Sequence, residues 1–120
     1  MNGGGQSTRT IAFDAMGGDF APDAALRAAA ALSRSTDIRV LLVGDERRLE
    51  PALAQSGADP ARIEVLHAPD AVAMDEHPGH AAQRPDTSLA LAARAVAERR
   101  AQALVSAGNT GALLLVAARA

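Results

Sequence analysis

The sequence of 120 residues contains no cysteine, lysine, tryptophan or tyrosine, and its two phenylalanines are Phe13 and Phe20. Without cysteine the chain can form no disulfide bond, no thiolate metal site and no cysteine nucleophile. Because aromatic residues are so few, the 48% of hydrophobic residues are mostly Ala, Val, Leu and Ile. Small apolar side chains suit helices that pack closely on a sheet. The composition therefore favours an α/β fold over a β-sandwich.

Long apolar runs and clustered charge are also absent. The net charge is -2, and no run of basic residues marks a nucleic-acid partner. No apolar run approaches the roughly 20 residues that span a bilayer. Residues 1–8 are polar and glycine-rich without a hydrophobic segment, so they predict a disordered leader rather than a secretory signal. We expect a cytoplasmic protein, with a peripheral membrane contact left open.

Strand and helix patterns alternate along the rest of the chain. The run at 38–43 is almost continuously branched and apolar, which is typical of a parallel strand covered on both faces. Such alternation predicts one three-layer α/β/α domain with a mainly parallel sheet and ligands at the carboxyl ends of the strands. We expect residues 9–120 to be a truncated part of that domain, because the last helix carries no stop signal before Ala120. Strands are expected at 9–13, 38–43, 63–66 and 103–106, and helices at 23–34, 46–56, 85–100 and from 111 onward.

The first candidate site is the turn D-A-M-G-G-D at residues 14–19, between an expected strand and an expected helix. Gly17 and Gly18 let backbone N–H groups approach an anion closely. The dinucleotide and P-loop patterns are not matched. Asp14 and Asp19 could bind a metal, orient a ligand or act as base or cap. The alternative is an ordinary tight turn.

The second candidate is the segment V-S-A-G-N-T-G at residues 105–111, where a strand leads into a helix. Its hydroxyl and amide donors and the helix amino terminus together suit phosphate or a developing oxyanion. The alternative is helix capping by Asn109 or Thr110. If Thr110 is the cap and Asn109 an oxyanion donor, Asn109→Ala should lower turnover far more than stability. Both glycine turns should lie at one edge of the sheet, with phosphate between them.

The third candidate is the long polar segment 67–84, since long loops are usually functional or mobile. Asp75, Glu76, His77 and His80 suggest a metal, but the proline and glycine inside H-P-G-H remove the helical face that a zinc H-E-x-x-H motif uses. A flexible polar loop is therefore favoured over a metal site. Arg84 can hold phosphate through two hydrogen bonds.

Three segments in this order resemble the bacterial phosphate acyltransferase (PlsX) family: I-A-F-D-A-M-G-G-D-F-A-P at 11–22, M-D-E-H-P at 74–78 and V-S-A-G-N-T-G-A-L at 105–113. The resemblance covers roughly the first third of a family member. It implies an α/β/α fold like those of phosphotransacetylases and isocitrate-dehydrogenase-like proteins, a homodimer, and a soluble enzyme that works at the membrane surface. We expect no cofactor and no metal. Residues 79–87 depart from the pattern, with fewer basic residues and one residue less.

The implied reaction moves a fatty acyl group from acyl carrier protein to inorganic phosphate. The acyl phosphate then serves a membrane-bound glycerol-3-phosphate acyltransferase in phospholipid synthesis. For this reaction we expect Asp14, Asp19 and Asn109 to act in catalysis, and Gly17, Gly18, Arg84, Ser106, Gly108, Thr110 and Gly111 to bind substrate.

Three other functions are open on the residues alone. A phosphate-ester hydrolase could use Asp14 as its nucleophile, although Met16 stands where a second aspartate would be needed. An oxidoreductase is possible by fold analogy only. A non-catalytic fragment that only binds phosphate is the third, and we expect the segment alone to be inactive because it supplies one side of a cleft.

Overall fold

A computed structural model describes residues 9–119 and shows a four-stranded, all-parallel sheet with the strand order β3-β2-β1-β4. The strands are β1 (Thr10–Asp14), β2 (Arg39–Gly44), β3 (Ile63–His67) and β4 (Ala103–Ser106). All four predicted strands are confirmed to within a residue at each end. The predicted leader, residues 1–8, lies outside the described residues.

Four helices lie where the sequence predicts them: α1 (Asp23–Ser35), α2 (Glu46–Ala54), α4 (Ser88–Ala97) and α5 (Thr110–Arg119). Helix α4 is shorter than expected at both ends. Thr87 caps it, accepting a hydrogen bond from the N–H of Ala90 at 3.0 Å. Its carboxyl end is set by Arg99, whose φ of 65° is left-handed. A non-glycine residue in this conformation leaves no sequence signal for the helix end.

The expectation of an irregular loop over 67–84 is wrong in part, because the segment contains the short helix α3 (Pro78–Ala81). The ring of His77 caps this helix, its Nδ1 accepting from the N–H of Gly79 at 3.0 Å. Proline at the first helical position and a polar cap before it favour a helix start. The surrounding backbone is also fixed, since Asp70 pairs with Thr87 in an isolated parallel bridge.

Side-chain alternation along the strands divides the core into two layers. Phe13 and Leu42 face α1 and α2, where they pack with Leu49. Ala12 and Leu41 face the opposite side, where α4 covers them. Strand residues two apart share a face, so Asp14 continues the face of Ala12 and points to the α4 side. The expected α/β/α arrangement is confirmed.

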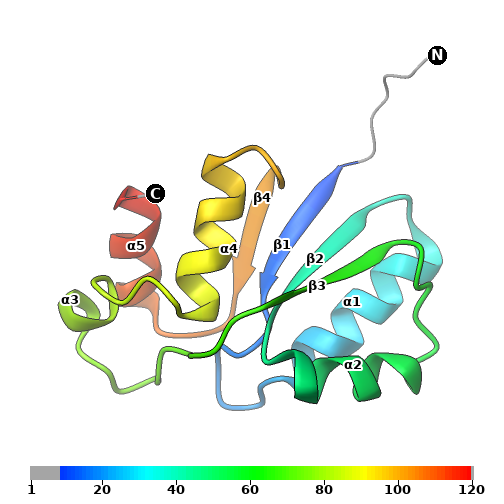
Figure 1. Ribbon diagram of the computed structural model, residues 1–120, viewed down its shortest axis with the longest axis horizontal. Helices are drawn as coiled ribbons and strands as arrows, with labels where there is room; N and C mark the ends of the chain where they lie inside the picture. The colour runs from blue at the N-terminus through cyan, green and yellow to red at the C-terminus, as the bar shows by residue number, and fades with distance from the viewer. Residues whose placement is uncertain (1–8, 120) are drawn as a thin grey trace.

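A third apolar cluster joins α3, α4 and α5 beside β4, and Figure 1 shows these three helices gathered on that side of the molecule. Gly111 at the start of α5 lies against α3. A Cβ there would lie 2.6 Å from Cγ of Pro78, so only glycine permits this approach. The cluster consists of Val72, Ala81, Leu89, Ala93, Ala112 and Val116.

The direction in which successive strands are added to the sheet changes at β1. From β1 the chain moves outward to β2 and β3, and α4 then returns it to β4 on the other side of β1. In Figure 1 the arrowheads of β1 and β4 point to the same edge, where the loops that follow them begin. Ligands of open α/β sheets bind at such a switch point, beyond the carboxyl ends of the strands. Among residues 9–119, no helix is long and apolar enough to cross a membrane.

Candidate functional site

The turns that follow β1 and β4 touch each other at the switch point. A Cβ on Gly17 would lie 2.7 Å from Oδ2 of Asp14, 2.9 Å from Oγ of Ser106 and 3.1 Å from the backbone N of Gly108. A Cβ on Gly108 would in turn lie 3.1 Å from Cα of Gly17. The prediction that both turns lie at one edge is confirmed, and their contact requires glycine at position 17 and leaves little room for a Cβ at position 108.

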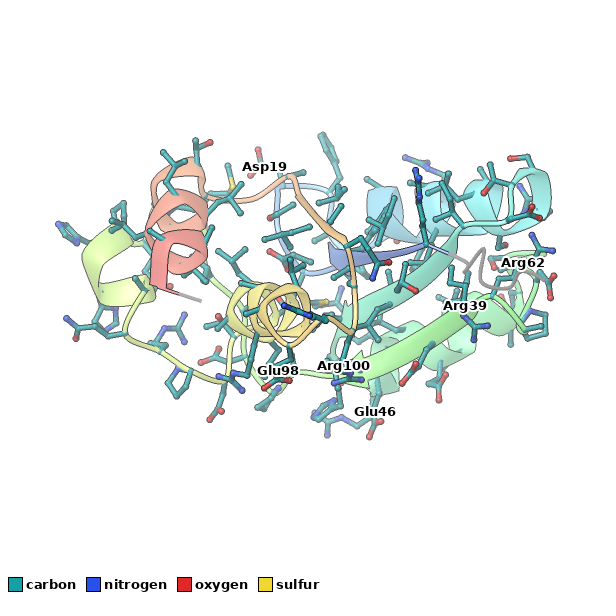
Figure 2. The ribbon with its side chains drawn as sticks, turned by 90° about the horizontal axis from the view of Figure 1, so that it is seen from above. Asp19, Arg39, Glu46, Arg62, Glu98 and Arg100 are labelled. Carbon is teal, nitrogen blue, oxygen red and sulfur yellow. The ribbon has the colours of Figure 1, made fainter. Side chains whose placement is uncertain are left out.

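The next residues carry the first turn toward α1. Gly18 has a φ of 93°, and a Cβ there would lie 3.0 Å from the carbonyl oxygen of Ala107. Asp19 is exposed beyond this contact. Figure 2 shows it well apart from Arg39 and Arg62, which lie at the amino end of the sheet. The carboxylate of Asp19 therefore lies at the solvent rim of the paired turns.

Asp14 is only 5% exposed, and its carboxylate is held by three donors. Ser106 Oγ donates to Oδ2 at 2.9 Å, the N–H of Met16 donates to Oδ1 at 3.2 Å, and Ser88 Oγ donates to Oδ1. Ser106 Oγ also accepts from the N–H of Gly108 at 3.1 Å. The carboxylate thus connects the ends of β1 and β4 with the start of α4. Ser88 was not among the predicted site residues.

Several backbone N–H groups at this edge have no partner among the described residues. Within residues 9–119, those of Gly17, Gly18, Thr110 and Gly111 have no hydrogen-bond acceptor. Two belong to the glycine turn and two to the first turn of α5. Unpaired N–H groups at a glycine turn beside a helix amino terminus are the usual surroundings of a bound anion.

Asn109 caps α5 itself, so the capping alternative is realised by Asn109 and not by the exposed Thr110. Its Oδ1 accepts from the N–H of Ala112 at 3.1 Å. Its Nδ2 donates to the carbonyl of Glu76 at 2.7 Å and contacts two further carbonyls, those of Ala73 and Met74, at 3.3 Å. Both ends of this amide are therefore engaged inside the chain.

Arg84 is bound by carboxylates of its own segment. It pairs with Glu76 at 2.7 Å and with Asp70, and it donates to the carbonyl of Ala71 at 2.8 Å. The hydrogen bonds from Arg84 lower the pKa of Glu76, and those to Glu76 raise the pKa of Arg84. The guanidinium that was predicted to bind phosphate thus forms ion pairs with carboxylates of its own segment. Glu76 contacts Arg84 through its side chain and Asn109 through its backbone, which ties this segment to α5.

The two histidines of the segment have local partners. Nδ1 of His80 lies 3.1 Å from Oε2 of Glu76, and His77 caps α3. Over the part of the chain that the structure describes, no group of three or more His, Cys, Asp or Glu side chains could hold a metal ion.

Known proteins resemble this chain over nearly its whole length. The profile of the family described as "Fatty acid synthesis protein" matches residues 9–119. A phosphate acyltransferase from Ectopseudomonas mendocina is 46% identical over 111 residues, and the match covers 90% of this chain and 33% of the relative. Those from Gloeothece citriformis and Desulfitobacterium hafniense are 44% and 48% identical, over 90% and 85% of this chain and 31% and 30% of the relatives.

The chain belongs to the fatty acid synthesis protein family, because the match covers all the described residues. The resemblance to phosphate acyltransferases seen in the three motifs is thereby confirmed. The chain spans about a third of the length of the curated relatives it matches.

Proposed function

We propose, from membership of this family, that the chain forms the phosphate-binding part of an acyl-[acyl-carrier-protein]:phosphate acyltransferase. The observation that carries the proposal is the contact between the two glycine turns at the switch point, with unpaired N–H groups on the first turn and at the start of α5. The relatives named phosphate acyltransferase support the reaction class. The chain spans a third of their length, and in this proposal the acyl side of the cleft belongs to the rest of the whole enzyme.

In the proposed reaction, an oxygen of inorganic phosphate attacks the thioester carbonyl of the acyl carrier protein. The C–S bond breaks, the thiol stays on the carrier protein, and acyl phosphate is released. Backbone N–H groups of Gly17, Gly18 and the first turn of α5 hold the phosphate in position for attack. N–H groups in such a fixed arrangement also stabilise a developing oxyanion. No covalent enzyme intermediate and no cofactor is needed.

The side chains take different roles in this proposal. Asp14 and Ser106 hold the two turns together, because the Ser106 hydroxyl donates a hydrogen bond to the Asp14 carboxylate. Asp19 is the exposed carboxylate at the rim, where it can assist proton transfer. Asn109 fixes the start of α5 through its cap, and Arg84 orders the segment that Asn109 contacts. Thr110 offers its exposed side chain and backbone N–H to the phosphate.

A phosphate-ester hydrolase with Asp14 as nucleophile fits the geometry poorly. The carboxylate is 5% exposed, and both of its oxygens accept hydrogen bonds from serine hydroxyls. An in-line nucleophile needs one oxygen free and facing the phosphorus atom. Asp14 therefore acts in support of the backbone site.

The biological setting belongs to the same proposal. The acyl phosphate passes to a membrane-bound glycerol-3-phosphate acyltransferase for phosphatidic acid synthesis. The whole enzyme works as a cytoplasmic homodimer with a peripheral membrane contact that delivers this labile product.

A chimaeric enzyme tests the function. Residues 9–119 replace the corresponding segment of the Ectopseudomonas mendocina relative, and phosphate-dependent thiol release from acyl carrier protein is measured. We expect activity in the chimaera and its loss on Gly17→Ala, because the new Cβ would lie 2.7 Å from Asp14 Oδ2. Gly79→Ala is the matched control, since its Cβ meets only the ring of His77. A folded chimaera whose thiol release does not depend on phosphate would contradict the proposal.

A further inference from the structure

We propose that Ser88 is a positioning residue for phosphate binding: its buried hydroxyl fixes the carboxylate of Asp14, which in turn sets the separation of the two glycine turns. This inference rests on the proposed function. It assigns a role to a residue outside both glycine motifs. Ser88 lies 74 positions from Asp14 in the sequence and is joined to it by the fold alone.

Each carboxylate oxygen of Asp14 receives one serine hydroxyl. Oδ1 accepts from Ser88 and Oδ2 accepts from Ser106. The donors come from the start of α4 and the end of β4, and Ser88 is only 1% exposed. Hydrogen bonds to a charged acceptor are stronger than neutral ones, and they restrict the carboxylate to one orientation. With either hydroxyl removed, one oxygen loses its side-chain donor and the carboxylate can rotate.

The orientation of this carboxylate determines where both turns lie. Oδ1 also accepts the N–H of Met16, which begins the first turn, and Ser106 accepts the N–H of Gly108 in the second. A Cβ on Gly17 would lie 2.7 Å from Oδ2, so the turn is packed directly on the carboxylate. A rotation of Asp14 therefore displaces the backbone N–H groups that are to hold phosphate.

The position of the Ser88 hydroxyl is itself fixed by its neighbours. The N–H of Ser88 donates to the carbonyl of Asp70 at 2.9 Å, and the preceding Thr87 caps α4. Because Ser88 is buried beneath Asp14, it acts through the carboxylate and not by touching phosphate. Its effect should appear in phosphate affinity in addition to stability.

Ser33 provides a matched control for this effect. It is 2% exposed, its Oγ donates to the carbonyl of Ala30 at 2.7 Å, and it accepts from the N–H of Asp59 at 3.0 Å. It lies near the carboxyl end of α1, next to the loop that enters β2 at the amino end of the sheet. Ser33→Ala thus also removes a buried hydroxyl with a tertiary hydrogen bond, far from the glycine turns.

The test titrates inorganic phosphate into the 120-residue chain, with the amide signals of Gly17, Gly18 and Gly108 followed by NMR. Ser88→Ala should weaken phosphate binding about tenfold, the size expected for a lost hydrogen bond to a charged group. Ser33→Ala should leave the affinity unchanged, while both variants lower Tm. Ser88→Cys keeps a side-chain donor at this position, but a weaker and longer one, so it should also weaken binding.

The test distinguishes failure of the positioning role of Ser88 from failure of the phosphate site itself. Phosphate binding that is unchanged in Ser88→Ala and Ser88→Cys, together with a lowered Tm, would overturn the positioning role and leave the phosphate site intact. Equal weakening by Ser33→Ala would overturn it as well, because the effect would then follow stability alone. If the unsubstituted chain shows no response of the three glycine amides, the proposed phosphate site is wrong, and the inference fails with it.

Discussion

Replacing Asn109 by alanine should destabilise the chain strongly, because one amide both caps a helix and holds a long segment in place. Its Oδ1 accepts from Ala112, and its Nδ2 donates to the carbonyl of Glu76. The premise that Thr110 supplies the cap is wrong. The expected loss of turnover stays a prediction, and because Asn109 is itself the cap, a loss of stability should accompany it.

The magnitude follows from the two functions of the amide. A lost N-cap costs about 1 kcal/mol. The hydrogen bonds from Nδ2 to the carbonyls contribute about 1 kcal/mol more, since these carbonyls can partly return to water. The sum of about 2 kcal/mol corresponds to a fall in Tm of about 8 °C for a domain near this size.

Urea unfolding of the 120-residue chain measures this loss, with two variants that separate its parts. Asn109→Ser keeps an oxygen for the cap and removes the Nδ2 donors, so it should lose about half as much, about 1 kcal/mol. Thr110→Ala removes an exposed side chain that makes no cap and should be neutral. If Thr110→Ala were the more destabilising substitution, the assignment of the cap to Asn109 would be refuted.

Further predictions concern single positions. Gly17→Ala should cost about 1–3 kcal/mol by overpacking, whereas Gly79→Ala should change the free energy of unfolding little, since its Cβ meets only the ring of the exposed His77 at 3.1 Å. Arg99→Gly should raise the free energy of unfolding in urea by about 1 kcal/mol, because glycine adopts the left-handed backbone conformation of residue 99 without strain. The lowered pKa of Glu76 means that its ionised side chain stabilises the folded chain; this contribution is complete above the ordinary pKa of 4.5 and is lost as the pH falls through the lowered value. Thermal melts across this pH range should therefore show a smaller fall in Tm for Glu76→Gln than for the unsubstituted chain. The isolated chain should release no thiol from acyl carrier protein, as an assay with phosphate present will show.

The sheet could be predicted from the sequence because each strand is marked on both sides. Glycine or a polar residue ends β1, β2 and β4, and the run in β2 is too short and too branched for a helix. Helix α3 was missed because it has only four residues, too few to show a period, and begins at a proline read as a loop signal. The end of α4 was missed because Arg99 occupies a position where glycine is the usual marker.

The side chains at the site were harder to predict because their partners are set by tertiary contacts. Arg84 is suited to phosphate by its chemistry, but Glu76 and Asp70 lie within reach once the segment folds back around α3. Asn109 could be a donor or a cap from its sequence alone. What decides between these roles is the position of the backbone near Glu76, which no local pattern of residues specifies.

The network at Asp14 could be derived from the sequence by one further step. Parallel register places Asp14 opposite Ser106 at the last pair of β1 and β4, so their contact follows once the strand order is known. Residues two apart share a face, so Asp14 points to the same side as Ala12, which α4 covers. A helix that crosses this face from the carboxyl edge begins beside Asp14, and its first residue is Ser88. The strand order is thus the missing information, and it depends on the return of the chain from β3 to β4 across β1, a property of the whole fold and not of any one motif.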